Sequence, residues 1–397
     1  MSGTGPGPAH AAALAGLPGM TPVRLARLLA DGDPSETWAR LVEGPHRVED
    51  DRGFAASARR TDPIEVGEEY ARAGVAILMP GGPGYPTPLA GDPGAPAVLF
   101  ARGDTAVLED RRRVAIVGTR SATPYGRKVA SELGRQLAAD GVVVVSGLAR
   151  GIDGAAHAGA VRASADDPGR PVAVVGTGVD VVYPASNRAL WEQVASDGVV
   201  LSESPLGTAP LPRVFPARNR IIAALVDVVV VVECHHRGGA LITAEAAARR
   251  GIPVCAVPGS VQSRASEGTN GLLVDGCTPV RDAADVLVAV SLARTGRRPP
   301  APAVEAASLV AARGRDRHRP GDGGRRRPDA NRGHAERADL PEGSPERAVL
   351  EAVEDVPTSF ETILLRTALA IPEAVDACHR LVAEGRLRSG AGWWSRR

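Results

Sequence analysis

Short apolar runs that end near glycine or a polar residue recur through the middle of the chain. They are VAIVG (114–118), VVVVSG (142–147), VAVVG (172–176), VVLSE (199–203), DVVVVVE (227–233) and PVCAVPG (253–259). Continuous β-branched runs of this length are typical of strands buried on both faces, as in a parallel sheet. Helical patterns such as GRKVASELGRQLAADG and ALITAEAAARRG separate them. This alternation predicts an α/β fold with a doubly wound, mostly parallel, Rossmann-like sheet.

The residues before this region have the pattern of short helices. Apolar positions at Leu14, Leu17, Leu25 and Leu28 are interrupted by the turn Pro18-Gly19-Met20-Thr21-Pro22. Two short helices joined by a glycine turn resemble a helix-hairpin-helix unit, whose backbone N–H groups can hold a phosphate. The excess of acidic over basic residues here favours the alternative, a helical packing module. We therefore predict a small helical domain over 1–76 and a sheet-based core over 77–290.

The two segments after the core differ from it and from each other. Residues 291–343 are rich in Arg, Pro, Gly and Asp and almost lack large apolar residues, which predicts a disordered linker. Residues 344–397 are expected to refold as a winged-helix-like domain: a helix capped by Ser344, a second capped by Thr358, a third over 372–385, and two strands around 390–392. In that domain, Trp393 and Trp394 are expected to anchor the strands to the helices.

Composition limits the function classes. The 47 basic and 46 acidic side chains give a net charge of +1, so nucleic-acid binding cannot be argued from overall charge and must rest on local patches. No apolar run approaches the length of a membrane span, and the N-terminus lacks the pattern of a signal peptide. The four cysteines are scattered, which suits a reducing cytoplasm and argues against a structural metal site.

The first predicted strand of the core ends in Gly118-Thr119-Arg120, just before a helix. A glycine turn at a helix start exposes N–H groups that suit a phosphate, and Arg120 adds a forked donor. The dinucleotide pattern GxGxxG is absent, and Ser146-Gly147 stand at the second strand end, where a ribose-binding carboxylate would be expected. The sequence predicts phosphate binding without a nucleotide cofactor.

The turn after the second strand contains Gly151, Asp153 and His157. A catalytic Asp–His pair is one interpretation, but no nucleophile or metal partner accompanies it, so a helix cap and a packed imidazole are favoured. Consecutive Cys234, His235 and His236 would point in different directions, and no further ligand is suitably spaced, so we predict no metal site.

Two further segments carry candidate DNA-binding residues. In FPARNRIIAAL, Arg218, Asn219 and Arg220 open a helix and form a predicted anion site, and Gly239 begins the next helix. Arg188 and Trp191 lie three residues apart on one helix face, which places a charge for phosphate beside a ring for base stacking. The alternative, that Trp191 belongs to the core, is given equal weight.

These motifs together resemble one family. VAIVGTR, VVSGLARGIDGAAHAGA, VAVVGTGVDVVYPASN, SESPLGTAP, FPARNRIIAAL, GALITAEAAARRG and VCAVPGS follow the order found in the DNA-processing protein A (DprA/Smf) family, and MPGGPGYPTPLAGDPGAPAVLFARGD upstream also matches. The resemblance implies a cytoplasmic, non-catalytic homodimer that binds and protects incoming single-stranded DNA and loads the RecA recombinase onto it in natural transformation. By the same resemblance the dimer interface lies in the core, near Leu272 and Leu273. Two stretches depart from the family pattern, Leu225-Val226 and Glu267–Gly271.

Two rival functions remain. Pro80-Gly81-Gly82-Pro83-Gly84 imitates the opening of the PGGxGTxxE motif of lysine-decarboxylase-like phosphoribohydrolases, which hydrolyse nucleoside monophosphates. Tyr85 and Pro86 replace the residues that should follow, and no glutamate stands at the required spacing. A scaffold that binds no ligand is the other alternative. Arginines at the helix starts argue against it, because buried and unpaired guanidinium groups are costly.

Overall fold

The computed structural model describes residues 6–30, 32–43, 53–109, 111–211, 214–296, 340–341, 344–353, 358–359, 363, 366–367, 369, 371–390 and 393–396. The chain divides into two units, Met1–Asp316 and Arg317–Arg397, which are described separately. No helix among these residues is long and apolar enough to cross a membrane.

A nine-stranded sheet organises the first unit, in the order β1-β2-β6-β5-β4-β3-β7-β8-β9. The strands are β1 (Val75–Leu78), β2 (Leu99–Gly103), β3 (Arg113–Val117), β4 (Val143–Ser146), β5 (Val172–Val174), β6 (Val199–Ser202), β7 (Val228–Val231), β8 (Val254–Ala256) and β9 (Thr278–Pro279). Strands β3 to β9 are parallel, whereas β1 and β2 form an antiparallel edge next to β6. The predicted doubly wound α/β fold and all six predicted strands are confirmed.

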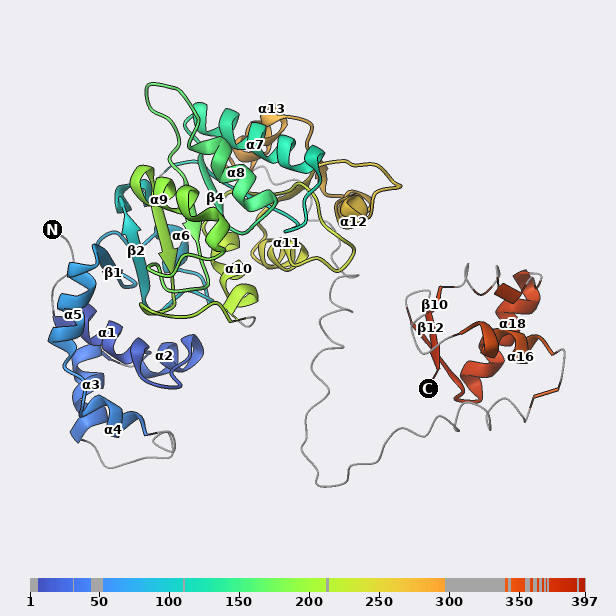
Figure 1. Cartoon of the computed structure of the whole chain (residues 1–397), viewed down its shortest axis with the longest axis horizontal. Helices are drawn as coiled ribbons and strands as arrows, with labels where there is room; N and C mark the ends of the chain where they lie inside the picture. Colours follow the sequence, from blue (N-terminus) through green and yellow to red (C-terminus); the bar gives the residue numbers. More distant parts are fainter. Residues whose placement is uncertain are drawn as a thin grey trace. The chain divides into compact units, whose positions relative to one another are not determined.

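Helices cover both faces of the sheet because each central strand is apolar on both sides. On β3, Val114 and Ile116 pack beneath α7 (Pro124–Ala139), α8 (Ile152–Ala160) and α13 (Ala283–Arg294), as the layers in Figure 1 show. The alternate residues Ala115 and Val117 belong to the opposite cluster, with α10 (Val214–Ala224) and α11 (Ala240–Arg249). This period of two is the one expected of a strand buried on both faces.

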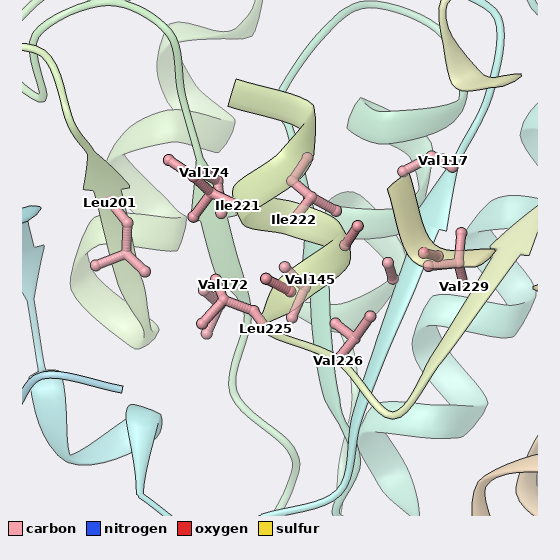
Figure 2. Packing of buried hydrophobic residues seen from close by; sticks show 14 of the residues in the cluster. Val117, Val145, Val172, Val174, Leu201, Ile221, Ile222, Leu225, Val226 and Val229 are labelled. Carbon is pink, nitrogen blue, oxygen red and sulfur yellow. The ribbon is translucent and has the colours of Figure 1, made fainter. Parts of the chain in front are cut away.

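Helix α10 is fixed on the sheet by branched side chains. Ile221 and Ile222, each 1% exposed, lie among valines of β4 and β5 (Figure 2). Leu225 and Val226, which depart from the family pattern, extend the same cluster and are also buried. Because α10 is packed along this length, its first turn is held at the carboxyl ends of the neighbouring parallel strands.

The helices before the sheet are α1 (Pro6–Gly16), α2 (Pro22–Leu28), α3 (Pro34–Glu43), α4 (Phe54–Ala58) and α5 (Pro63–Arg72). The predicted pair α1 and α2 is confirmed, and Thr21 caps α2 by accepting from Arg24 N at 3.3 Å. These helices share one apolar cluster with β1, β2 and α9 (Arg188–Asp197). In it, Tyr70 of α5 packs on Phe100 with ring centroids 4.9 Å apart.

Three features of the first unit differ from the predictions. The antiparallel strands β1 and β2 were not predicted, and the segment between them contains the short helix α6 (Thr87–Ala90). The boundary predicted at residue 76 therefore falls inside β1. At the other end, α13 continues to Arg294, past the predicted start of the linker. The linker residues 297–339 lie outside the described residues, so the prediction of disorder stays a prediction.

The C-terminal unit contains α16 (Pro345–Ala352), α18 (Ile371–Ala383) and a three-stranded antiparallel sheet of β10 (Thr358–Ser359), β12 (Trp393–Arg396) and β11 (Leu387–Gly390). Ser344 caps α16 as predicted, and the predicted final hairpin is present. Thr358 does not begin a helix; it pairs with Trp394 in the sheet. Trp394 packs against the small apolar core of this unit. The assignment as winged-helix-like stays a prediction.

Candidate nucleic-acid interface

The candidate site lies at the carboxyl edge of the parallel strands. Strand order reverses at β3, because the chain proceeds outward to β4 on one side and later returns to β7 on the other. In open α/β sheets, ligands bind at such a switch point, outside the carboxyl ends of the strands. The turns after β3, β4, β5 and β7 all lie at this edge, and they contain half of the DNA-binding residues selected from the sequence: Gly118, Thr119, Arg120, Gly147, Gly151 and Gly239.

Three side chains from separate segments form a stack here, which we call the stacking platform: Arg120 after β3, Tyr183 after β5 and Phe215 in the first turn of α10. The guanidinium carbon of Arg120 lies 4.8 Å from the centroid of the Phe215 ring. The Phe215 and Tyr183 centroids are 5.4 Å apart with an interplanar angle of 35°. Arg120 is exposed, Tyr183 is 41% exposed and Phe215 between them is half-buried, so the outer surface of the platform is accessible. It combines a cation with two aromatic faces, as single-stranded nucleic-acid sites do.

Further arginines lie in segments at the same edge of the sheet. Arg150 in the turn after β4, Arg188 at the start of α9 and Arg237 after β7 are exposed, and none forms an ion pair with a carboxylate in the part of the chain that the structure describes. Together with Arg120 we call them the edge arginines. A guanidinium that has no internal partner remains available to a phosphate.

Backbone contacts hold the turns of this edge together. Ile152 N donates to Thr119 O at 3.2 Å, which joins the turns after β3 and β4. The Asn187 amide donates to Leu148 O at 3.0 Å, which brings the start of α9, and therefore Arg188, beside the turn that carries Arg150. Gly151 has φ +81°, and a Cβ there would overlap Thr119 O, so the predicted glycine is required for this close approach.

Arg218, predicted to bind phosphate, is buried instead. It is 5% exposed, and its Nη1 donates to Val174 O at the end of β5. Its guanidinium lies against Gly147, where a Cβ would overlap it. Burial lowers the Arg218 pKa, and the neighbouring Asp153 opposes this effect. Arg218 therefore positions the turns, and the prediction of direct contact is wrong for this conformation because the side chain turns inward.

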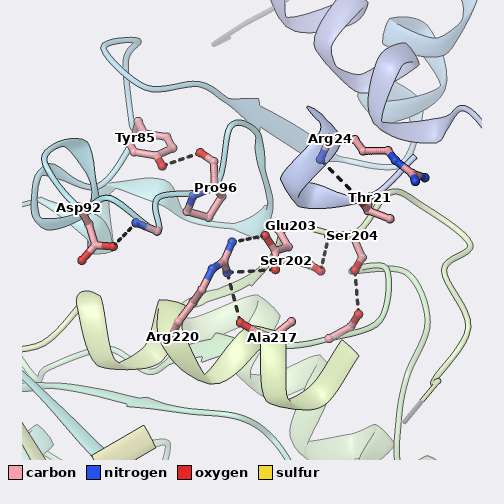
Figure 3. Close-up of polar contacts among 12 residues, drawn as sticks. Thr21, Arg24, Tyr85, Asp92, Pro96, Ser202, Glu203, Ser204, Ala217 and Arg220 are labelled. Carbon is pink, nitrogen blue, oxygen red and sulfur yellow. Dashed lines mark hydrogen bonds and ion pairs between the residues drawn. The ribbon is translucent and has the colours of Figure 1, made fainter. Parts of the chain in front are cut away.

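Arg220 is also engaged inside the protein. Its two terminal nitrogens bind both carboxylate oxygens of Glu203 at 3.0 and 2.6 Å (Figure 3). The Glu203 side chain is only 8% exposed. Burial raises the Glu203 pKa, and the Arg220 charge opposes this effect. A bidentate pair of this kind leaves Arg220 little capacity for DNA, so the predicted DNA contact is not supported.

Two more predicted contacts are corrected by burial. Trp191 is 1% exposed and packs in the cluster shared by α9 and the N-terminal helices, so its ring cannot stack on a base; the alternative interpretation as core is the right one. Ser146 is fully buried, and its hydroxyl donates to Ile116 O at 2.6 Å. Both side chains are directed into the interior of the protein and not toward the edge.

The remaining predicted residues are engaged by the backbone or keep open roles. Gly118 and Thr119 form the turn after β3, and Thr119 N donates to Glu233 O at 2.7 Å, so this amide is not free for the predicted phosphate contact. Asn219 donates to Gly239 O at 3.3 Å and joins α10 to the start of α11. Gly239 is exposed. Leu272 and Leu273 are partly buried on α12 (Glu267–Val274).

The Asp–His pair considered from the sequence is a packing feature, but the predicted helix cap is wrong: Asp153 lies inside α8, and Gly151 stands at the cap position. His157 is fully buried and its Nε2 donates to Val172 O at 3.2 Å, while Nδ1 has no partner among the described residues. Burial lowers the His157 pKa to about 4, so the ring is neutral at physiological pH. No group of three or more His, Cys, Asp or Glu in the described ranges is arranged to hold a metal ion.

Comparison with known proteins identifies the core. The family model described as DNA recombination-mediator protein A matches residues 76–291, more than half of the chain. This chain belongs to that family. DNA processing protein DprA of Bacillus subtilis is 38% identical over 217 residues, 55% of this chain and 72% of its own length. Its Streptococcus pneumoniae counterpart is 41% identical over 203 residues, 51% and 70% respectively.

A solved structure agrees with the sequence comparison. The X-ray structure of DprA from Streptococcus pneumoniae superposes with a TM-score of 0.60 at 33% identity, covering 70% of this chain and 95% of that one. The resemblance inferred from the motifs is therefore confirmed, and with it the role of the DNA recombination-mediator protein A family in DNA processing. The matched region contains every residue of the stacking platform.

Sequence reasoning missed four residues of this family member's candidate interface: Phe215, Tyr183, Arg150 and Arg237. Two of them carried a signal. Phe215 directly precedes the arginine-rich helix start, and Tyr183 stands in a loop between two glycine-led motifs, in a chain where aromatic residues make up 3%. Their closeness to Arg120 depends on the order of the strands, which no local pattern reports.

Proposed function

We propose that this protein binds single-stranded DNA across the carboxyl edge of its sheet, as a recombination mediator without catalytic activity of its own. The observation that carries the proposal is the stacking platform, in which Arg120, Phe215 and Tyr183 from three segments form one accessible cation–aromatic stack. A base stacked on such a ring contributes about 1–3 kcal/mol, independent of its identity. The edge arginines supply the charge for the phosphate backbone on either side of it.

The test is binding of the full chain to a labelled single-stranded oligonucleotide of mixed sequence over a salt series. Phe215→Ala should weaken binding by about 1–3 kcal/mol and leave the salt dependence unchanged, because it removes a ring and no charge. Arg120→Ala should reduce the slope of log affinity against log salt by about 0.7, the value for one phosphate contact on a single strand. The same oligonucleotide annealed to its complement should bind more weakly, since paired bases cannot stack on the platform.

Arg170→Ala is the matched control for charge. Arg170 lies before β5, at the opposite edge of the sheet, where it binds Asp104. Its loss should leave the salt slope as in the wild type. If Arg120→Ala and Arg170→Ala both keep the wild-type salt slope, the proposed site is overturned.

We further propose, on the family resemblance, that the protein protects incoming DNA and loads the RecA recombinase during natural transformation. In the same proposal it acts in the cytoplasm as a homodimer through Leu272 and Leu273. Both leucines are partly buried, and the next residue, Val274, is 88% exposed, which supports a partner-covered α12. Leu273→Glu should convert a dimer to a monomer in sedimentation, and an unchanged mass would refute this interface.

The rival enzymatic function receives little support from its motif. Pro80–Gly84 lies between the antiparallel strands β1 and β2, and not at the carboxyl end of a parallel strand. Tyr85, which replaces the threonine of the motif, is buried and donates to Pro96 O at 2.7 Å. We expect no hydrolysis of AMP; hydrolysis that disappears in Arg120→Ala would favour the enzyme.

A further inference from the structure

A carboxylate side chain of this protein lies at the N-terminus of helix α7, where a ligand's phosphate would bind. In nucleotide-binding sheets, the turn between the first parallel strand and its helix holds a phosphate on free N–H groups. Here the carboxylate of Glu233, which follows β7 and is 1% exposed, accepts from Thr123 N at 2.9 Å and from Thr123 Oγ1 at 2.5 Å. A Cβ at Gly126 in the first turn of α7 would overlap this carboxylate. The position expected of a ligand's phosphate oxygens is therefore already filled by this side chain.

A second buried carboxyl group lies beside the neighbouring turns. Asp153 is 6% exposed, and its carboxyl group lies near the N–H groups of Gly118 and Gly147, the residues that follow β3 and β4. Burial raises the Asp153 pKa, and the Arg218 charge opposes this effect. The Asp153 carboxyl group therefore stands beside the amides that a nucleotide phosphate would use at these two strand ends.

We propose that Glu233 and Asp153 are internal anions that occupy the phosphate positions of a nucleotide-binding sheet, and that they make this core selective for polymeric DNA over free mononucleotides. The inference rests on the proposed function for the polymer. With both inner positions closed, binding comes from the outer layer, where the stacking platform and the edge arginines touch several nucleotides at once. A mononucleotide can use only one of these weak contacts.

The experiment removes the internal anion and supplies another. Glu233→Ala in the full chain opens the start of α7 and leaves the Thr123 N–H and hydroxyl groups without their acceptor. Thermal melts are recorded with inorganic phosphate or acetate, at constant ionic strength set with sodium chloride and without DNA. We expect Glu233→Ala to melt several degrees below the wild type and to regain part of that loss in a saturable way, since a ligand that binds the folded state stabilises it.

Val230→Ala is the matched control. Val230 is a fully buried residue of β7, so its truncation destabilises the same strand through an apolar cavity that attracts no anion. Its response to phosphate and acetate should equal that of the wild type, which also corrects for weak anion binding at the edge arginines. An equal response in Glu233→Ala and Val230→Ala would overturn the proposal.

Glu233→Gln covers the case in which the alanine variant does not fold. The amide has the size of the carboxylate but no charge, so we expect a lower melting temperature and no extra response to phosphate. A melting temperature equal to the wild type would show that the charge is not needed, and would overturn the proposal. Because no DNA is present, these results are independent of the Phe215 and Arg120 binding tests, so the two proposals can fail separately.

Discussion

Replacing Trp191 by alanine should reduce stability without removing a DNA contact. The ring is 1% exposed and packs with Phe100, Leu148 and Val200. A tryptophan buries roughly 150–250 Å², and at about 25 cal/mol per Å² this corresponds to about 4–6 kcal/mol. Measured truncations of large aromatic residues cost about 3–5 kcal/mol, which we take as the expected loss. At about 2–4 °C per kcal/mol, the melting temperature should fall by roughly 6–20 °C.

Trp191→Phe separates packing from polarity. The indole N–H has no hydrogen-bond partner among the described residues, so losing it leaves no partner unsatisfied. The smaller ring still fills most of the site, and we expect a loss below about 1.5 kcal/mol.

The assay combines thermal melts with single-strand binding measured well below the melting temperature of each variant. Folded Trp191→Ala should bind with wild-type affinity and salt slope, in contrast to Phe215→Ala, which should keep its stability and lose affinity. A Trp191→Ala protein with wild-type melting temperature and reduced DNA binding would refute the assignment of this ring to the core and restore it to the interface.

Three further predictions concern the turns and their charges. Gly151→Ala should destabilise the protein and weaken DNA binding in the oligonucleotide assay, because φ is +81° and the added Cβ would overlap neighbouring backbone atoms. Gly239→Ala is the control and should melt like the wild type, because no atom lies within 4 Å of a Cβ placed there. The His157 pKa is lowered to about 4, against 6.5 in the unfolded chain. Its contribution to the free energy of unfolding is therefore complete above pH 6.5 and is lost as the pH falls toward 4. In denaturant unfolding, the stability of His157→Gln should depend less on pH in that window. Arg220→Ala should cost about 1–3 kcal/mol in chemical denaturation, because Glu203 is left buried without its partner, and should leave the salt slope of DNA binding unchanged; a reduced slope would contradict its internal role.

Local patterns in the sequence were enough to predict the strands and helices that form the layers of the core. Six runs of β-branched residues predicted β3 to β8, because a strand buried on both faces must be apolar at every position. The turns that contain glycine indicated where the chain approaches itself. At Gly151 the positive φ shows why a glycine is needed there. The antiparallel β1 and β2 were missed, because each is short and their pairing with β6 joins segments far apart in the chain.

Which arginines face outward was decided only by the tertiary structure. Arg218 and Arg220 stand two residues apart on α10 and look equally suited to phosphate, but one turns into the sheet toward Val174 and the other meets Glu203 from the end of β6. Their partners come from other strands, so no spacing in the sequence could report them. The same is true of Arg120, Phe215 and Tyr183, which become neighbours only when strand order brings three separate segments to one edge. The sequence determined that this edge would carry arginines and aromatic residues, and the packing of the sheet determined which of them are free to bind.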